Sequence, residues 1–345
     1  MTPATLEILP TPLDYSAIPA RELVERIEYR KRELNAVILG HNYQRTEVQA
    51  VSDYIGDSLG LSQEAASTDA ETIVFCGVHF MAETAKVLSP EKRVLMPDLR
   101  AGCPMADFVT GGALRRLMND HPDAVVVAYV NSTAEVKALA DVCVTSSNAV
   151  RIVETIPRDT PILFVPDKNL ADYVAEKTGR ENIIAWEGYC YVHDDMVLDE
   201  LERARTAHPE AKVVVHPEAR RELLEAADFV TSTAGMVALA EEHDALIFGT
   251  ERGLVDRMRE NFPQKTMIPL SGAAICGNMK LNTLAKLAWC LDHGEHEVIL
   301  DDEIREGAAE ALERMLELSG GWRAPTEEEA ELEAAGVRPR GCGCA

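Results

Sequence analysis

Short aliphatic runs alternate with amphipathic segments along most of this chain, and residues 212–269 show the pattern most clearly. The apolar runs there have the length and β-branched content of buried strands, expected at 212–216, 228–230, 245–248 and 265–269. The segments between them carry apolar residues at helical spacing, which predicts helices at 217–227, 234–243 and 252–261. Short apolar strands alternating with helices indicate an α/β fold with a parallel sheet covered on both faces.

The same pattern occurs twice more, earlier in the chain. Aliphatic runs that end in polar residues recur at 36–44, 124–132 and 211–219, and His41, Tyr129 and His216 in these runs lie 88 and 87 residues apart. Hydroxyl-bearing turns keep the same register, because Ser58, Ser146 and Thr233 also lie 88 and 87 residues apart. A period of this length is much longer than that of a solenoid repeat, so each copy is expected to be a small domain.

The repeat predicts three homologous three-layer αβα domains with parallel sheets, arranged around a pseudo-threefold axis. The expected division is an N-terminal extension at 1–20, repeats at 21–105, 106–192 and 193–278, C-terminal helices at 279–320 that pack on the first repeat, and an acidic tail at 321–345 that is expected to be mobile.

Three of the eight cysteines follow the last strand of their repeats: Cys103, Cys190 and Cys276, spaced by 87 and 86 residues. Right-handed crossovers place post-strand loops at one sheet edge, so the symmetry would bring the three thiols together. Three sulfur ligands are one fewer than a closed zinc site needs, and they suit one [4Fe–4S] cluster per chain with one iron left open. An open iron can act as a Lewis acid on a substrate.

Composition narrows the classes of function. The chain has 345 residues, 46% of them apolar, and a formal net charge of −24. This charge argues against a general nucleic-acid or anionic-membrane binder, because such surfaces need clustered Lys and Arg, whereas a small anionic substrate remains compatible. The first twenty residues lack the pattern of a signal peptide, and no apolar run approaches the roughly 18 residues of a membrane helix. We therefore expect a cytoplasmic protein whose cysteines do not form structural disulfides.

The motifs GHNYQ, GDSLGLS, FCGVHFMAETA, AGCPMAD, YVNS, GYCYVH, VHPE, TSTAGM, GTERG and CGNMK span roughly residues 36–280. Together they resemble the quinolinate synthase family. The resemblance implies a condensation of iminoaspartate (iminosuccinate) with dihydroxyacetone phosphate to give quinolinate, a precursor of NAD. It also implies an oxygen-sensitive [4Fe–4S] cluster held by three cysteines at the centre of three αβα domains. The implied protein partners are L-aspartate oxidase, as a functional neighbour, and the iron–sulfur assembly machinery.

Four candidate site residues follow the first strands of repeats one and two. His41 and Tyr43 lie on either side of Asn42, so in an extended segment their side chains can point to the same face. By resemblance His41 contacts the substrate and Tyr43 assists proton transfer. Tyr129 and Asn131 repeat this spacing, and the resemblance places them around the substrate, although a tyrosine there can also be a packing residue.

The third repeat and the second cysteine loop supply the remaining acid and base candidates. Pro217 suits the first position of a helix, which would put Glu218 in the first turn as a carboxylate favoured by the helix dipole. The alternative for Glu218 is a general base, which the resemblance favours, with His216 as a substrate-binding neighbour. His193 follows Cys190 by three residues. It is a candidate proton donor to the substrate, a candidate fourth metal ligand, or a candidate hydrogen-bond donor to a metal ligand.

Ser58, Ser146 and Thr233 are expected at helix N-termini, where serine and threonine commonly cap the helix by accepting a hydrogen bond from a backbone amide. A hydroxyl beside free backbone N–H groups also binds anions. By resemblance these residues hold the carboxylates of iminoaspartate or the phosphate of its co-substrate.

Two alternative functions remain open on the residues alone. One is another open-cluster [4Fe–4S] enzyme with the same threefold architecture, and the other is a non-enzymatic three-cysteine metal or redox sensor. We expect Cys76, Cys143 and Cys290 to be buried and chemically inert, because they lie in apolar stretches. Cys342 and Cys344 lie in the C-terminal tail, and for them a redox role stays open.

Overall fold

The computed structural model describes residues 11–320, so the expected tail, with Cys342 and Cys344, lies outside the described residues. Within this range the chain forms three parallel four-stranded sheets, one in each repeat. Each sheet has the same order, with its first strand between the second and the third and its fourth strand outside the third. The predicted α/β class with three parallel-sheet modules is confirmed.

The first unit begins with two helices that precede its sheet. Its helices are α1 (Pro12–Tyr15), α2 (Ala20–Glu33), α3 (Thr46–Gln49), α4 (Ser58–Ser67) and α5 (His79–Leu88). Its strands are β1 (Ala36–His41), β2 (Tyr54–Gly56), β3 (Thr72–Cys76) and β4 (Arg93–Leu95). All residues of β3 are buried, as expected for a strand covered by helices on both faces.

The second unit repeats this arrangement. Its helices are the 3₁₀ turn η1 (Ala106–Phe108), α6 (Gly111–Asp120), α7 (Ala134–Lys137), α8 (Ala149–Thr155) and α9 (Lys168–Thr178). Its strands are β5 (Val125–Tyr129), β6 (Val142–Val144), β7 (Ile162–Val165) and β8 (Ile183–Ala185).

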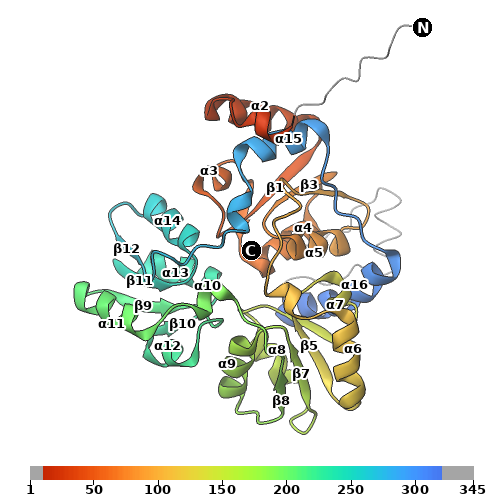
Figure 1. Cartoon of the computed structure of the whole chain (residues 1–345), viewed down its shortest axis with the longest axis vertical. Helices are drawn as coiled ribbons and strands as arrows, with labels where there is room; N and C mark the ends of the chain where they lie inside the picture. The colour runs from red at the N-terminus through yellow and green to blue at the C-terminus, as the bar shows by residue number, and fades with distance from the viewer. Residues whose placement is uncertain (1–10, 321–345) are drawn as a thin grey trace.

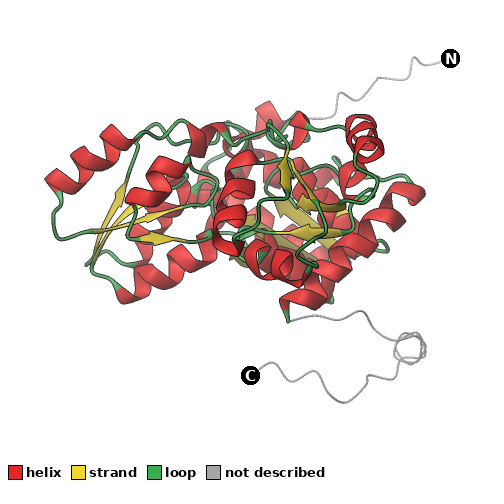
Figure 2. Cartoon of the chain, turned by 90° about the horizontal axis from the view of Figure 1, so that it is seen from below, coloured by secondary structure: helices red, strands yellow, loops and turns green. Residues whose placement is uncertain are grey.

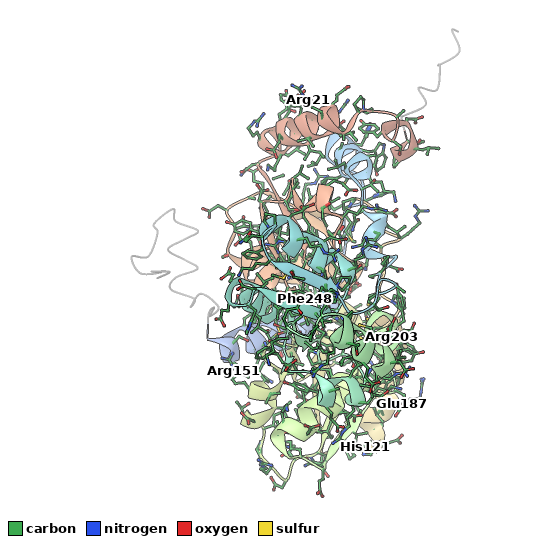
Figure 3. The ribbon with its side chains drawn as sticks, turned by 90° about the vertical axis from the view of Figure 1, so that its left-hand side faces the viewer. Arg21, His121, Arg151, Glu187, Arg203 and Phe248 are labelled. Atoms are coloured by element: carbon green, nitrogen blue, oxygen red, sulfur yellow. The ribbon has the colours of Figure 1, made fainter. Side chains whose placement is uncertain are left out.

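The third unit closes the group. Its helices are α10 (Tyr191–Asp194), α11 (Leu198–Ala207), α12 (Arg221–Ala226), α13 (Thr233–Glu242) and α14 (Arg252–Asn261). Its strands are β9 (Lys212–Val215), β10 (Phe229–Val230), β11 (Ala245–Gly249) and β12 (Thr266–Pro269). Phe248 on β11 is fully buried inside this unit, whereas Arg21 and Arg203 lie at the outside (Figure 3).

The three units surround a common centre (Figure 1), and helices flank the strands on either side (Figure 2). The crossovers are all between parallel strands, so the carboxyl ends of the strands in one unit share one edge of its sheet. The polar residues that follow β1, β5 and β9 therefore leave their sheets at equivalent places.

The C-terminal helices join different units. After the 3₁₀ turn η2 (Met279–Leu281), α15 (Leu284–His293) packs against α1 and α2 of the first unit. The last helix, α16 (Asp302–Ser319), differs from the expectation, because it packs on α7, β6 and α8 of the second unit as well as on α5. Its buried face, which includes Leu312 and Met315, completes the core of the second unit.

One local prediction is corrected around Glu218. The helix expected from residue 217 begins only at Arg221, because residues 216–219 form a tight turn in which the Ala219 amide donates to the His216 carbonyl (3.0 Å). Glu218 therefore lies in this turn, and its interpretation as a first-turn helix carboxylate is wrong.

Candidate functional site

One central cavity is lined by every candidate site residue from the three units. The residues predicted from the sequence that line it are His41, Tyr43, Ser58, Cys103, Tyr129, Asn131, Ser146, Cys190, His193, His216, Glu218, Thr233 and Cys276. Because these residues span more than 230 positions of the chain, their meeting depends on the packing of the units against one another.

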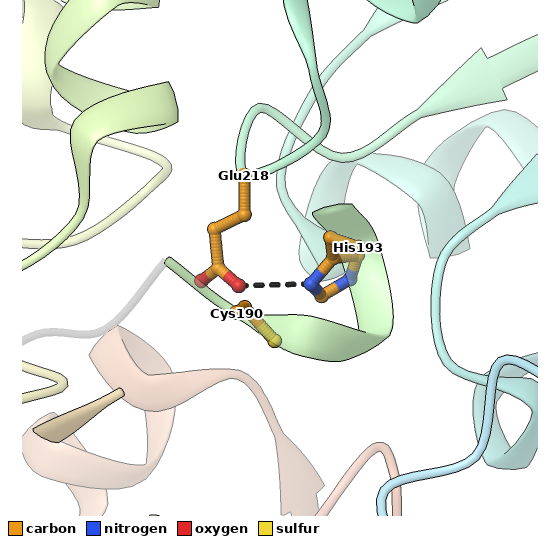
Figure 4. Close-up of side chains that lie close together, drawn as sticks. All are labelled: Cys190, His193 and Glu218. Carbon is orange, nitrogen blue, oxygen red and sulfur yellow. Dashed lines mark ion pairs between the residues drawn. The ribbon is translucent and has the colours of Figure 1, made fainter. Parts of the chain in front are cut away.

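Glu218 is the electrostatic centre of the cavity. The Tyr129 hydroxyl and the Asn131 amide (3.3 Å), both from the second unit, donate to its Oε1, while His193 Nδ1 lies 2.8 Å from its Oε2 (Figure 4). Burial would raise the pKa of this carboxyl, but His193, His216 and the hydrogen bonds outweigh burial and lower the pKa to about 2. Glu218 is therefore a buried, ionised carboxylate that joins the second and third units.

His41 and His216 occupy equivalent positions and use the same backbone contact. The Tyr43 amide donates to His41 Nδ1 (3.1 Å), and the Glu218 amide donates to His216 Nδ1 (3.3 Å). Burial lowers the pKa of both imidazoles to about 3, so both rings are neutral at physiological pH. A neutral ring that accepts at Nδ1 carries its proton on Nε2, so each histidine is left with one N–H donor for a ligand in the cavity.

Tyr43 and His193 are linked by a residue that the sequence analysis did not select. The Thr250 hydroxyl lies 2.7 Å from the Tyr43 hydroxyl and 3.0 Å from His193 Nε2, and Thr250 is completely buried. Burial and the nearby Glu218 charge raise the pKa of Tyr43 well above its usual value, so its hydroxyl remains protonated. The signal for Thr250 was its place directly after β11, but a lone threonine at a strand end is common.

The three candidate cysteine ligands lie along the same cavity. Cys103, Cys190 and Cys276 come from three different loops and line the same cavity. Burial raises the pKa of all three thiols, and mutual repulsion contributes: Cys276 acts on Cys103, and both act on Cys190. A cation bound between these thiols would favour their ionised form and so lower their pKa values.

His193 is close enough to Cys190 and Glu218 to share a metal ion with them, since their ligand atoms lie within 4.8 Å of one another. Its ring, however, already faces Glu218 through Nδ1 and Thr250 through Nε2. The Nδ1 contact has ion-pair distance but not hydrogen-bond geometry, so the arrangement is compatible both with proton exchange with Glu218 and with a metal-ligand role for His193.

The three candidate hydroxyl residues are not the capping residues of their helices. Asp57 caps α4 by accepting from the Gly60 amide (2.9 Å), and Ser232 caps α13 by accepting from the Gly235 amide (3.4 Å). Ser58 and Thr233 follow these caps as first helical residues, and Ser146 lies in the turn before α8. Their hydroxyls therefore line the cavity without a capping task.

A buried ion pair supports the third cysteine loop, and it too was missed. Glu251 is fully buried, accepts from the Cys276 amide (3.0 Å) and lies 3.0 Å from Lys280 Nζ. Asp167, another buried acid, caps α9 at the equivalent position of the second unit. An acid after the third strand in two repeats was the available signal, but its burial could not be read from the sequence.

The other cysteines within residues 11–320 do not line the cavity. Cys76, Cys143 and Cys290 are completely buried, and burial raises the pKa of each thiol. Among residues 11–320, every helix is too short or too polar to cross a membrane.

Comparison with known proteins places the chain in a described family. Residues 25–317 match the family described as Quinolinate synthetase A protein. A quinolinate synthase of Desulforudis audaxviator is 50% identical over 299 residues, which cover 86% of this chain and 98% of that protein. A quinolinate synthase of Synechocystis sp. is 45% identical over 306 residues, which cover 87% of this chain and 96% of that protein.

Proposed function

This chain belongs to the quinolinate synthetase A family, and we propose that it condenses iminoaspartate with dihydroxyacetone phosphate to give quinolinate, phosphate and two molecules of water. The family and the relatives establish an enzyme of the quinolinate synthase type, which serves NAD biosynthesis. They favour this function over the other open-cluster enzymes and over a metal or redox sensor. The observation that carries the proposal is the meeting of acid, base, hydroxyl and thiol groups from three units in one cavity.

We propose that Cys103, Cys190 and Cys276 hold one [4Fe–4S] cluster. The supporting observation is that three soft ligands from three loops line one cavity, since three cysteine ligands leave one iron of such a cluster without a protein ligand. When bound, such a cluster supplies a Lewis acid for a substrate oxygen or nitrogen.

The protein residues supply binding and proton transfer. Hydroxyl and imidazole N–H donors suit an anionic substrate, because His41 and His216 are neutral donors and Ser58, Ser146 and Thr233 line the same cavity. These groups would orient the enamine form of iminoaspartate so that its carbon displaces phosphate from the triose. Its nitrogen then closes on the carbonyl, and two molecules of water leave to form the pyridine ring.

Glu218 and Tyr43 have opposite protonation states, which assigns them different tasks. The ionised Glu218 can accept a proton during imine–enamine tautomerisation and the dehydrations, with His193 beside it to receive or return that proton. Tyr43 keeps its proton and is therefore a donor to a developing negative charge or a leaving hydroxyl.

Anaerobic purification and assay test this proposal. A brown protein that forms quinolinate from oxaloacetate, ammonia and dihydroxyacetone phosphate is expected. A colourless zinc protein, or a brown protein inert with these substrates, would overturn it. A cytoplasmic location, a link to L-aspartate oxidase and cluster delivery by the iron–sulfur assembly machinery remain predictions.

A further inference from the structure

A buried asparagine connects the first unit to the start of α13 in the third unit. Asn42 follows β1 and is 1% exposed. Its Oδ1 accepts from Arg257 Nη1 on α14 (2.6 Å), and its Nδ2 donates to the Thr233 hydroxyl at the start of α13 (3.1 Å). Thr233 lines the cavity, whereas Asn42 and Arg257 are not among the lining residues.

The backbone of Asn42 is held in place on both sides. Its amide donates to the Gly56 carbonyl (3.1 Å), and its carbonyl accepts from Gln49 Nε2 (3.1 Å). The side chain therefore starts from a fixed point, and only its amide orientation remains to be determined.

Arg257 determines that orientation. A guanidinium only donates, so the Asn42 atom facing it must be the carbonyl oxygen, and the NH₂ group must then face Thr233. The Thr233 oxygen accepts this hydrogen bond, which leaves the hydroxyl proton free to point toward a ligand in the cavity. Within the described residues Arg257 forms no ion pair with a carboxylate, so its positive charge is not cancelled at close range.

We propose that Arg257 and Asn42 are positioning residues that make Thr233 an obligate hydrogen-bond donor to an anionic group of the substrate. The relay rests on the proposed function, since it assumes that the cavity receives a carboxylate or a phosphate. It crosses from the third unit to the first and back, so it acts only when these two units are packed together.

The equivalent hydroxyls have no such relay. Asn42 corresponds to Val130 and Pro217 in the other repeats, neither of which has a polar side chain. Within the described part of the chain the Ser58 and Ser146 hydroxyls have no protein hydrogen-bond partner, so they can donate or accept. Of these three hydroxyls, Thr233 is therefore the one whose role as a hydrogen-bond donor is set before a ligand binds.

Calorimetric titration of the anaerobic holoenzyme with inorganic phosphate and, separately, with succinate tests the relay. We expect Arg257→Gln to weaken binding of at least one of these anions by about ten- to a hundredfold, the range for one hydrogen bond to a charged group. Arg257→Lys should recover part of the loss. Arg259→Gln removes the same charge from the same helix and should change binding less than twofold.

Two further variants separate positioning from general stability. Thr233→Val should weaken binding by a similar factor, and adding Arg257→Gln to it should cost little more, because both changes act through one hydroxyl. Asn42→Asp keeps the shape and the contact to Arg257 but cannot donate, so it should bind the anion more weakly than Asn42→Ala while unfolding at a higher temperature.

The outcomes distinguish the relay from the overall reaction. If the wild-type protein makes no quinolinate but the anion affinities follow this pattern, the relay stands and the reaction fails. If quinolinate forms while neither anion binds, or while the losses from Arg257→Gln and Thr233→Val simply add, the relay is wrong.

Discussion

Thr250 gives the sharpest test of how the acid and base groups are held. Its hydroxyl is the shared partner of Tyr43 and His193, at 2.7 Å and 3.0 Å, in a place without solvent access. Thr250→Val keeps a similar shape and puts a methyl group where both side chains expect a polar partner. Thr250→Ser keeps the hydroxyl and is the matched control.

The structure sets the size of the effect. A buried polar group left without a partner costs about 1–3 kcal/mol, and here two groups lose the same partner. Tyr43 Oη and His193 Nε2 lie 3.4 Å apart, so they can partly satisfy each other after the substitution. We therefore expect Thr250→Val to lose about 1–3 kcal/mol of folding stability in total, which leaves the protein folded.

Activity should fall further than stability suggests. Tyr43 and His193 lose the contact that fixes their rings, and misplacement of proton-transfer groups commonly costs about 10- to 100-fold in rate. The assay is quinolinate formation under anaerobic conditions, with kcat and KM measured separately and thermal unfolding recorded in parallel. We expect kcat to fall with little change in KM. Equal kcat values for Thr250→Val, Thr250→Ser and the wild type would refute the reasoning.

Two other predictions follow from the cysteines and from a buried ion pair. Cys103→Ala should abolish the brown absorbance and the activity, whereas Cys143→Ala, at a buried site outside the cavity, should retain both in the same anaerobic preparation. Burial opposes ionisation of Asp98, but Arg100 (2.8 Å) and Lys286 (2.7 Å) outweigh burial and lower its pKa. This stabilisation is complete above the unfolded pKa of 3.8 and declines below it. Asp98→Asn should therefore lower the urea midpoint at pH 7, and the deficit should shrink toward pH 3; an equal deficit at both pH values would contradict this assignment.

The sequence was most informative where one signal recurred. The register of His41, Tyr129 and His216 predicted the three units with strands alternating with helices along each, because each strand is a local apolar run and each turn a local polar one. The same register selected the cysteines that line the cavity.

Local patterns were less informative at element ends and between units. Residue 217 resembled a helix start, but a hydrogen-bonded turn delays α12 to Arg221. The amphipathic stretch that forms α16 carried no sign of its partner, and it packs largely on the second unit. An apolar helix face predicts that the face is buried, but only the tertiary structure shows which element buries it.

The sequence by itself determined the α/β class, the threefold repeat and the residue types that reach the centre, since these depend on short-range periodicity and on spacing along the chain. The tertiary structure alone decided which of those groups touch. It placed Glu218 between Tyr129 and His193, set Thr250 between two candidate acid–base groups and directed Asn42 at Thr233. Such contacts join residues up to 207 positions apart, and their distances and burial, which set the protonation states, arise only when the three units pack around one cavity.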